Sequence, residues 1–254
     1  MNTTETQAIE FALIIIGDEI LHSRRQDSHF LHFREFLTGR GMALGRCWIL
    51  PDESATLTSH LRFSMAGTLP AFVCGGIGAT PDDLTRACAA EAAGLKVERH
   101  SEAVALIEGR FKTDAYPSRI LMADLPSGCS LIPNPYNQIP GFSVGNHYFL
   151  PGFPEMAWPM AEWVLDQYYE QAQGRISERS LQILDAAESS LVPIMEQLSA
   201  LYTGLKMFSL PHIGPDSFVE LGFRGKGDLD EPMNTLKKIL KSRTIDYSEK
   251  NDAK

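Results

Sequence analysis

Apolar and polar stretches alternate along the first two thirds of the chain in a pattern that predicts strands followed by helices. Three continuous apolar runs have the composition of strands buried on both faces: 11–16, 47–50 and 69–74. Three further segments place their apolar residues at helical spacing: 30–40, 53–65 and 82–93. This β-α-β-α-β-α order predicts an α/β fold, namely a three-layer α/β/α domain with a mostly parallel sheet.

A second and smaller pattern follows a closing helix predicted at 154–169. Gln171-Ala172-Gln173-Gly174 has the composition of a linker. Beyond it, the pattern predicts strand, helix, strand, strand and helix in turn: 179–184, 188–201, 206–210, 218–223 and 231–241. We therefore expect an α/β/α domain over 8–172, a small α+β (β-α-β-β-α) domain over 176–242 and a disordered tail over 243–254.

Charge and cysteine content narrow the class of protein. The 254 residues carry a formal net charge of −9 and are 44% hydrophobic, as expected for a soluble globular protein. An acidic chain is a poor candidate for non-specific nucleic-acid binding or for an anionic membrane surface, so we expect neither partner. The four cysteines form no C-x-x-C pair, and the polar start lacks a secretory pattern. A cytoplasmic location is the expectation.

The stretch from Cys74 to Thr85 concentrates the candidate chemistry. A predicted strand delivers Gly75, Gly76 and Gly78 to the start of a predicted helix, where Asp82 and Asp83 follow. Glycines let backbone N–H groups approach a ligand closely, and a helix start favours an anion such as phosphate. Adjacent carboxylates would repel a phosphate unless a divalent cation bridges them. The stretch thus predicts a metal-assisted site in which the N–H groups of Gly76 and Gly78 hold phosphate.

Helix capping offers a second interpretation of part of this stretch. Thr80 suits the N-cap, Pro81 the first helical position, and Asp83 the third residue of a capping box. Capping explains neither three glycines in four positions nor Asp82 beside Asp83. The residues alone leave a ligand-binding loop and a helix start both open.

A second pair of acids follows the first predicted strand. Gly17-Asp18-Glu19 comes directly after the run 11–16. Ligands of parallel α/β sheets bind beyond the carboxyl ends of the strands. If the first and third strands are neighbours, Asp18 and Glu19 converge with Asp82 and Asp83.

Together these segments resemble the molybdopterin-binding (MoaB/Mog) domain family, in particular the N-terminal and middle domains of its CinA-like branch. Five motifs carry the resemblance in order: Gly17-Asp18-Glu19-Ile20-Leu21, the loop from Gly75 to Thr85, Asn134-Pro135, Pro140-Gly141-Phe142 and Leu150-Pro151-Gly152-Phe153-Pro154-Glu155-Met156. The resemblance covers about residues 11–169, and the small second domain resembles the middle domain of that branch. Full-length relatives also have a C-terminal deamidase domain, which we do not expect within these 254 residues.

The resemblance implies a small phosphorylated ligand and leaves three functions open. The first is binding of a pterin phosphate, such as molybdopterin, or of a nucleotide pyrophosphate, with a place in molybdenum cofactor biosynthesis. The second is metal-dependent pyrophosphatase activity on ADP-ribose or a similar dinucleotide, and the third is a non-catalytic scaffold. Whether the chain is an enzyme stays open. Relatives form dimers or trimers, so a homo-oligomer is expected.

The resemblance also places the site residues. Asp82, Asp18 and Glu19 are expected to hold Mg²⁺ or another divalent metal, with Asp82 and Asp18 as catalytic residues. The expected ligand-binding residues are Gly75, Gly76, Gly78, Thr80, Asp83, Glu19, Asp27, His29, Gly152 and Pro154.

The chain departs from the family pattern after the first acidic pair. Ser23 stands where relatives have a glycine, and Asp27-Ser28-His29 replaces an Asp/Asn-Thr-Asn triplet. Ala79 replaces a proline in the glycine loop. Arg24 and Arg25 form a basic pair in an acidic protein, which could bind phosphate or form part of a solvated surface. These departures are compatible with a shifted substrate and with loss of catalysis.

Overall fold

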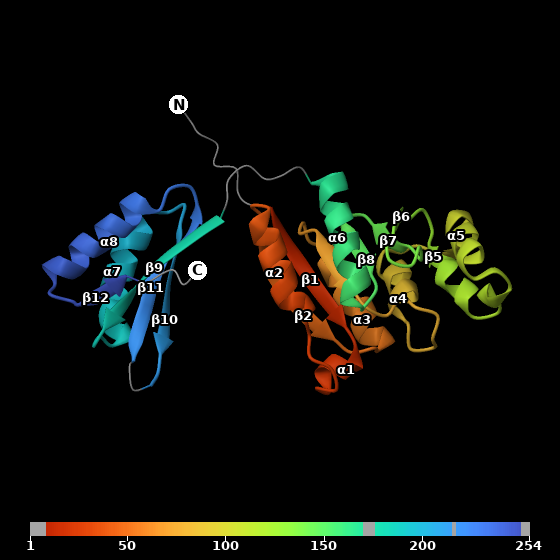
Figure 1. Cartoon of the computed structure of the whole chain (residues 1–254), viewed down its shortest axis with the longest axis horizontal. Helices are drawn as coiled ribbons and strands as arrows, with labels where there is room; N and C mark the ends of the chain where they lie inside the picture. The colour runs from red at the N-terminus through yellow and green to blue at the C-terminus, as the bar shows by residue number, and fades with distance from the viewer. Residues whose placement is uncertain (1–8, 170–175, 215–216, 250–254) are drawn as a thin grey trace, which may run out of the picture. The chain divides into compact units, whose positions relative to one another are not determined.

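The chain folds into two compact units, Ile9–Ala172 and a second unit that begins at Gln173 (Figure 1). A computed structural model describes residues 9–169, 176–214 and 217–249. The predicted linker at 171–174 lies outside the described residues. None of the helices in the described ranges is long and apolar enough to cross a membrane.

The first unit is built on a six-stranded sheet in the order β2-β1-β3-β8-β7-β6. Strands β2, β1, β3 and β8 run parallel to one another. Strand β7 pairs antiparallel with β8, and β6 pairs antiparallel with β7. This confirms the mostly parallel sheet and the neighbouring first and third strands. The strands are β1 (Glu10–Ile16), β2 (Ala43–Leu50), β3 (Ala71–Cys74), β6 (Ser130–Ile132), β7 (Gly141–Val144) and β8 (His147–Leu150).

Helices cover both faces of this sheet and complete the expected three layers (Figure 1). The cluster on one face joins α2 and α6 to the strands, and the cluster on the other joins α3, α4 and α5. The helices are α1 (Asp18–Leu21), α2 (His29–Gly39), α3 (Ser54–Met65), α4 (Thr85–Ala92), α5 (Ser101–Phe111) and α6 (Pro154–Tyr168). Two 3₁₀ turns, η1 (Lys112–Ala115) and η2 (Arg119–Ala123), and a two-stranded ribbon of β4 (Val97–Arg99) and β5 (Asp124–Pro126) extend the α5 side.

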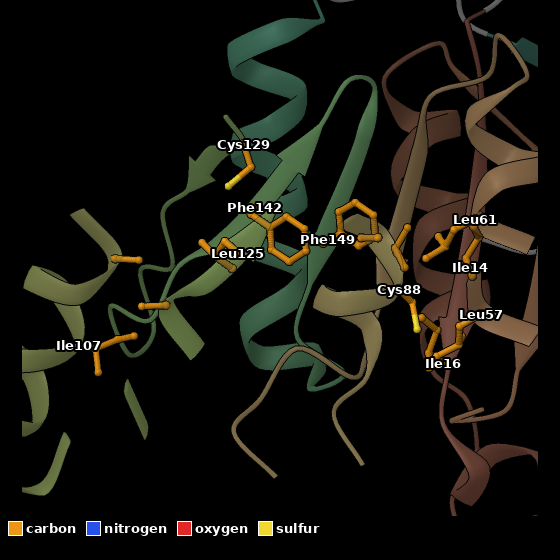
Figure 2. Packing of buried hydrophobic residues seen from close by; sticks show 14 of the residues in the cluster. Ile14, Ile16, Leu57, Leu61, Cys88, Ile107, Leu125, Cys129, Phe142 and Phe149 are labelled. Atoms are coloured by element: carbon orange, nitrogen blue, oxygen red, sulfur yellow. The ribbon is translucent and has the colours of Figure 1, made fainter. Parts of the chain in front are cut away.

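Alternation along β1 explains why an apolar run became a central strand. Leu13 and Ile15 join the core on the α2–α6 face, while Ile14 and Ile16 join the core on the opposite face. Figure 2 shows the latter core, in which the rings of Phe142 and Phe149 stack with centroids 4.5 Å apart. Each such buried side chain stabilises the fold by about 1.5–3 kcal/mol. The carboxyl end of β1 is therefore held firmly where the acidic loop begins.

The second unit is an antiparallel sheet in the order β10-β11-β9-β12, with two helices packed on it. Its elements are β9 (Ile176–Leu184), α7 (Glu188–Leu201), β10 (Lys206–His212), β11 (Phe218–Lys226), α8 (Asp230–Ser242) and β12 (Tyr247–Glu249). The expected β-α-β-β-α order is present, and β12 follows it.

The prediction of a disordered tail over 243–254 was wrong for its first part. Tyr247 pairs with Ile183 of β9, and Ile245 and Tyr247 both pack against the core of the second unit. Residues 250–254 lie outside the described range. The sequence pattern did not predict this three-residue strand, because it is specified by pairing with β9, which lies far away along the chain.

Candidate functional site

A cavity of about 540 Å³ opens at the carboxyl ends of β1, β2, β3 and β8. The loops that follow these strands form one side of it, and residues from α5, η2 and the 134–140 segment form the other. Its volume is in the range of sites for cofactor-sized ligands. The polar and charged residues that line it are Glu19, Arg25, Asp52, Thr80, Asp82, Asp83, Asn134 and Asn137.

The glycine loop forms the floor of the cavity and has a backbone that only glycine adopts readily. Gly75 has φ +116°, and a Cβ there would lie 2.2 Å from the Ile16 carbonyl oxygen. Gly76 has φ +65°, and its Cβ would lie 2.2 Å from Thr85 Oγ1. The buried Thr85 hydroxyl donates to the Gly75 carbonyl at 3.0 Å, and its N–H donates to the Gly76 carbonyl at 3.0 Å. Thr85, which the motif analysis did not single out, locks the loop.

Asp83 closes the loop from within. One carboxylate oxygen accepts the Gly78 N–H at 2.8 Å, and the other accepts the Thr80 N–H at 2.8 Å and the Thr80 hydroxyl at 2.5 Å. Two expectations are corrected here. Helix α4 begins at Thr85 rather than at Asp82, and the Gly78 N–H already donates to Asp83. Asp83 positions the loop, so its carboxylate has little capacity left for a ligand.

Gly76 and Ile77 supply the N–H groups that remain. Both residues line the cavity, and their N–H groups have no hydrogen-bond partner among the described residues. The N–H groups available to an anion are thus those of Gly76 and Ile77, and binding of a phosphate by Gly76 stays a prediction.

The acidic side of the cavity includes a carboxylate that motif analysis missed. Asp52 follows β2, and its Oδ2 accepts the N–H of Asp18 at 3.0 Å. Partial burial raises the pKa of Asp52, and the nearby charges of Asp18, Glu19 and Asp82 raise it further. Asp18, Glu19 and Asp82 thus all lie near enough to Asp52 for their charges to act on it. Their convergence with Asp83 on one ligand or metal stays a prediction. Asp52 could have been found from its position alone, because it follows the strand that pairs with β1.

The carboxylates differ in their environment. Glu19, Asp52, Asp82 and Asp83 line the cavity. Asp18, which is exposed like Glu19 and Asp82, does not line it and is linked to Asp52 through its backbone N–H and its charge. Within the described residues, no set of three His, Cys, Asp or Glu side chains is gathered closely enough to hold a metal ion by itself. The assignment of a metal to Asp82, Asp18 and Glu19 stays a prediction.

Asp27 and His29 do not line the main cavity, but both line a smaller cavity beside it. The Asp27 carboxylate accepts the N–H groups of His29 and Phe30 at 2.9 and 3.0 Å and so caps α2. His29 is buried, and its Nδ1 accepts the Trp158 Nε1–H at 3.3 Å. Its Nε2–H therefore donates to the Gly152 carbonyl at 3.1 Å, and burial lowers its pKa. His29 positions the Gly152 loop as a neutral ring.

A side cavity of about 230 Å³ adjoins the main one. Gly152 lines both cavities, and Pro154, the first residue of α6, lines only the smaller one. Direct ligand contacts by these two residues stay predictions. The two cavities also share Ile16, Glu19 and Arg25.

The lining of the main cavity also includes two asparagines and several apolar side chains. Asn134 is buried, its Oδ1 accepts the Tyr136 N–H at 3.0 Å, and its Nδ2 has no partner among the described residues. The apolar lining residues are Ile77, Phe111, Met122, Ile139, Pro140, Phe153 and Met156. The cavity thus combines charged groups, apolar side chains and one buried donor that has no partner among the described residues.

A family model described as "Probable molybdopterin binding domain" matches residues 12–171, which include every element that borders the cavity. The chain belongs to this molybdopterin-binding domain family. A CinA-like protein of Citrifermentans bemidjiense is 33% identical over 193 residues, which cover 73% of the chain and 47% of that protein. A protein of Pyrobaculum arsenaticum is 26% identical over 242 residues, covering 90% of the chain and 91% of that protein.

A solved structure shares the fold of the first unit. It is the protein CinA of Thermoplasma acidophilum, described as of unknown function, which is 26% identical in sequence and superposes with a TM-score of 0.59. The match covers 64% of this chain and 99% of the Thermoplasma acidophilum chain. The chain spans about half the length of the first curated relatives it matches. These comparisons confirm the family expected from the motifs and show similarity to CinA-like proteins.

Proposed function

We propose that the chain binds a phosphorylated heterocycle, a pterin phosphate or a nucleotide pyrophosphate, in the main cavity. One observation carries this proposal: two N–H groups of the glycine loop, without partners among the described residues, border the same cavity as four carboxylates. Backbone N–H groups suit a phosphate, and the carboxylates alone would repel it. A divalent cation between the two resolves the conflict.

Asp82 and Asp52, with Glu19 beside them, would hold such a cation. Because no three of these side chains form a closed cage, the ion would keep positions for water and for phosphate oxygens. Mg²⁺ prefers this arrangement of one or two carboxylates with phosphate and water ligands. When bound, the ion would polarise a phosphoryl oxygen. Partial burial is the main cause of the raised pKa of Asp52, and the neighbouring negative charges, which a cation would offset, add to it.

The apolar side chains that line the cavity suit the heterocycle. Flat rings would pack against Phe111, Met122 and Ile139, and a ring acceptor would satisfy Asn134 Nδ2. Both pterins and purines carry such acceptors, so these contacts do not distinguish a pterin ligand from a purine ligand.

Metal-dependent hydrolysis of a pyrophosphate is a second candidate, favoured by Asp52. A half-buried carboxylate of raised pKa beside a phosphate site can accept a proton from an attacking water. The reaction would break one P–O bond of the phosphoanhydride and leave two phosphomonoesters. Asp52 and Asp82 would then have roles in the reaction as well as in binding.

Phosphorus NMR and calorimetry test both functions. The protein is mixed with ADP-ribose, FAD or ATP in the presence of Mg²⁺ or Co²⁺, and again with EDTA. We expect metal-dependent binding that Asp82→Asn reduces at least 10-fold and that Asp246→Asn, an exposed aspartate of the second unit, leaves unchanged. New phosphomonoester signals would establish the hydrolase. Absence of binding, or equal affinity in Asp82→Asn, would contradict the metal-bridged site and favour a scaffold.

A further inference from the structure

Arg25 stands at the junction of the two cavities. It lines both the main cavity of about 540 Å³ and the side cavity of about 230 Å³. Among the described residues, it is the single lysine or arginine that lines either of them. A cation at this position matters because the rest of the polar lining is largely acidic.

The local structure holds the Arg25 side chain over the opening between the cavities. Its N–H donates to the Glu19 carbonyl at 3.0 Å, which ties its backbone to α1. Its guanidinium carbon lies 5.3 Å from the ring centroid of Phe153, within the range of a cation–π contact. Phe153 lines the main cavity as well. The stacked ring leaves the edges of the guanidinium, with their N–H donors, open to a further partner.

The positive charge of Arg25 has not been neutralised by its acidic neighbours. Glu19, Asp27 and Glu155 all border the side cavity, yet Arg25 forms no ion pair within 4.0 Å with any described residue. Asp27 is occupied by two backbone N–H groups. A guanidinium without a carboxylate partner at the edge of a phosphate-sized space is suited to a bidentate contact with a phosphate.

We propose that Arg25 binds a second phosphate of the ligand, so that the site selects diphosphates over monophosphates. The inference rests on the proposed function: the first phosphate lies at the Gly76–Ile77 N–H groups, and the second lies toward Arg25. The substituent on the second phosphate has the side cavity to occupy. A monophosphate would leave Arg25 unpartnered and would gain nothing from it.

The neighbouring Arg24 provides a matched control. It carries the same charge one residue away, is exposed, and lines neither cavity. Calorimetric titrations with AMP and ADP at saturating Mg²⁺ compare wild type with Arg25→Ala, Arg24→Ala and Arg25→Lys. We expect Arg25→Ala to weaken ADP binding about 10- to 100-fold and AMP binding less than about 3-fold. Arg24→Ala should change neither, and Arg25→Lys should retain part of the preference for ADP.

The outcomes separate this inference from the function on which it rests. If wild type binds AMP and ADP but Arg25→Ala weakens both equally, or neither, the second-phosphate role of Arg25 is overturned while the phosphate site stands. An equal effect of Arg24→Ala would reduce the role to general charge attraction and overturn it too. If wild type binds neither nucleotide, nor ADP-ribose or FAD, the proposed function fails and takes this inference with it.

Discussion

Gly76 couples the conformation of the glycine loop to its packing against α4. We expect Gly76→Ala to destabilise the first unit by about 2–4 kcal/mol, because a left-handed φ and a clash with Thr85 Oγ1 act together. Urea unfolding followed by tryptophan fluorescence measures this, since all three tryptophans, Trp48, Trp158 and Trp163, lie in the first unit.

Gly94 offers the control that separates the two causes. Its φ is +67°, close to that of Gly76, but a Cβ there would meet no heavy atom within 4 Å. Gly94→Ala should therefore cost only the conformational part, about 1 kcal/mol. Equal losses in the two variants would mean that Thr85 moves aside freely and that the loop is not locked as described.

Residue chemistry explains which parts of the site the sequence could predict. Paired acids and clustered glycines are visible in a motif, and the charges of Asp18, Glu19 and Asp82 all act on Asp52. Asp52 stands beside Glu53 in an ordinary turn, so only the pairing of β1 with β2 brings it to the site. The role of Asp83 depends on where its carboxylate points, which no spacing of residues encodes.

At the scale of elements, a buried histidine ties α3 to β8. His147 is fully buried, its Nδ1–H donates to the Asn146 side-chain oxygen, and its Nε2 accepts the Ser64 hydroxyl at 2.8 Å. Burial lowers the pKa of His147 to about 4, below the usual value of 6.5. In the unfolded chain His147 therefore binds a proton near pH 6.5, whereas in the folded chain it binds one only near pH 4.

The contribution of neutral His147 to the free energy of unfolding should accordingly be fully present above pH 6.5. It should fall by roughly 3 kcal/mol as the pH drops toward 4. Urea unfolding of the first unit at several pH values measures the slope. In His147→Gln this part of the slope should disappear, whatever the stability of the variant at neutral pH. Exposed His22→Gln should keep it. An unchanged slope in His147→Gln would assign the acid sensitivity to other groups.

Sequence patterns predicted the elements whose identity is decided by their own burial. The apolar runs of β1 and β3 and the helical spacing of α2 and α3 produced strands and helices as expected. The start of α4 was predicted three residues early, because Thr80-Pro81-Asp82-Asp83 has the composition of a helix start while Asp83 instead closes the preceding loop. Strand β12 was missed since its three residues are specified by β9, their pairing partner.

At the scale of the whole molecule, the two units have separate hydrophobic cores. The described residues of the first unit pack into one cluster on each face of its sheet, and those of the second unit form a third. Each unit has an interior large enough to unfold as a cooperative body. The homo-oligomer that the resemblance implies stays a prediction.

Calorimetry should resolve the two units as separate transitions. Leu221 is fully buried in the core of the second unit, so Leu221→Ala should remove about 2–5 kcal/mol from that unit and lower its transition by 10 °C or more. The transition of the first unit, identified by tryptophan fluorescence, should stay in place. Mg²⁺ with ADP should raise only the first transition, because a ligand stabilises the unit that binds it. A single transition that the variant and the ligand both move would mean that the two cores unfold as one body.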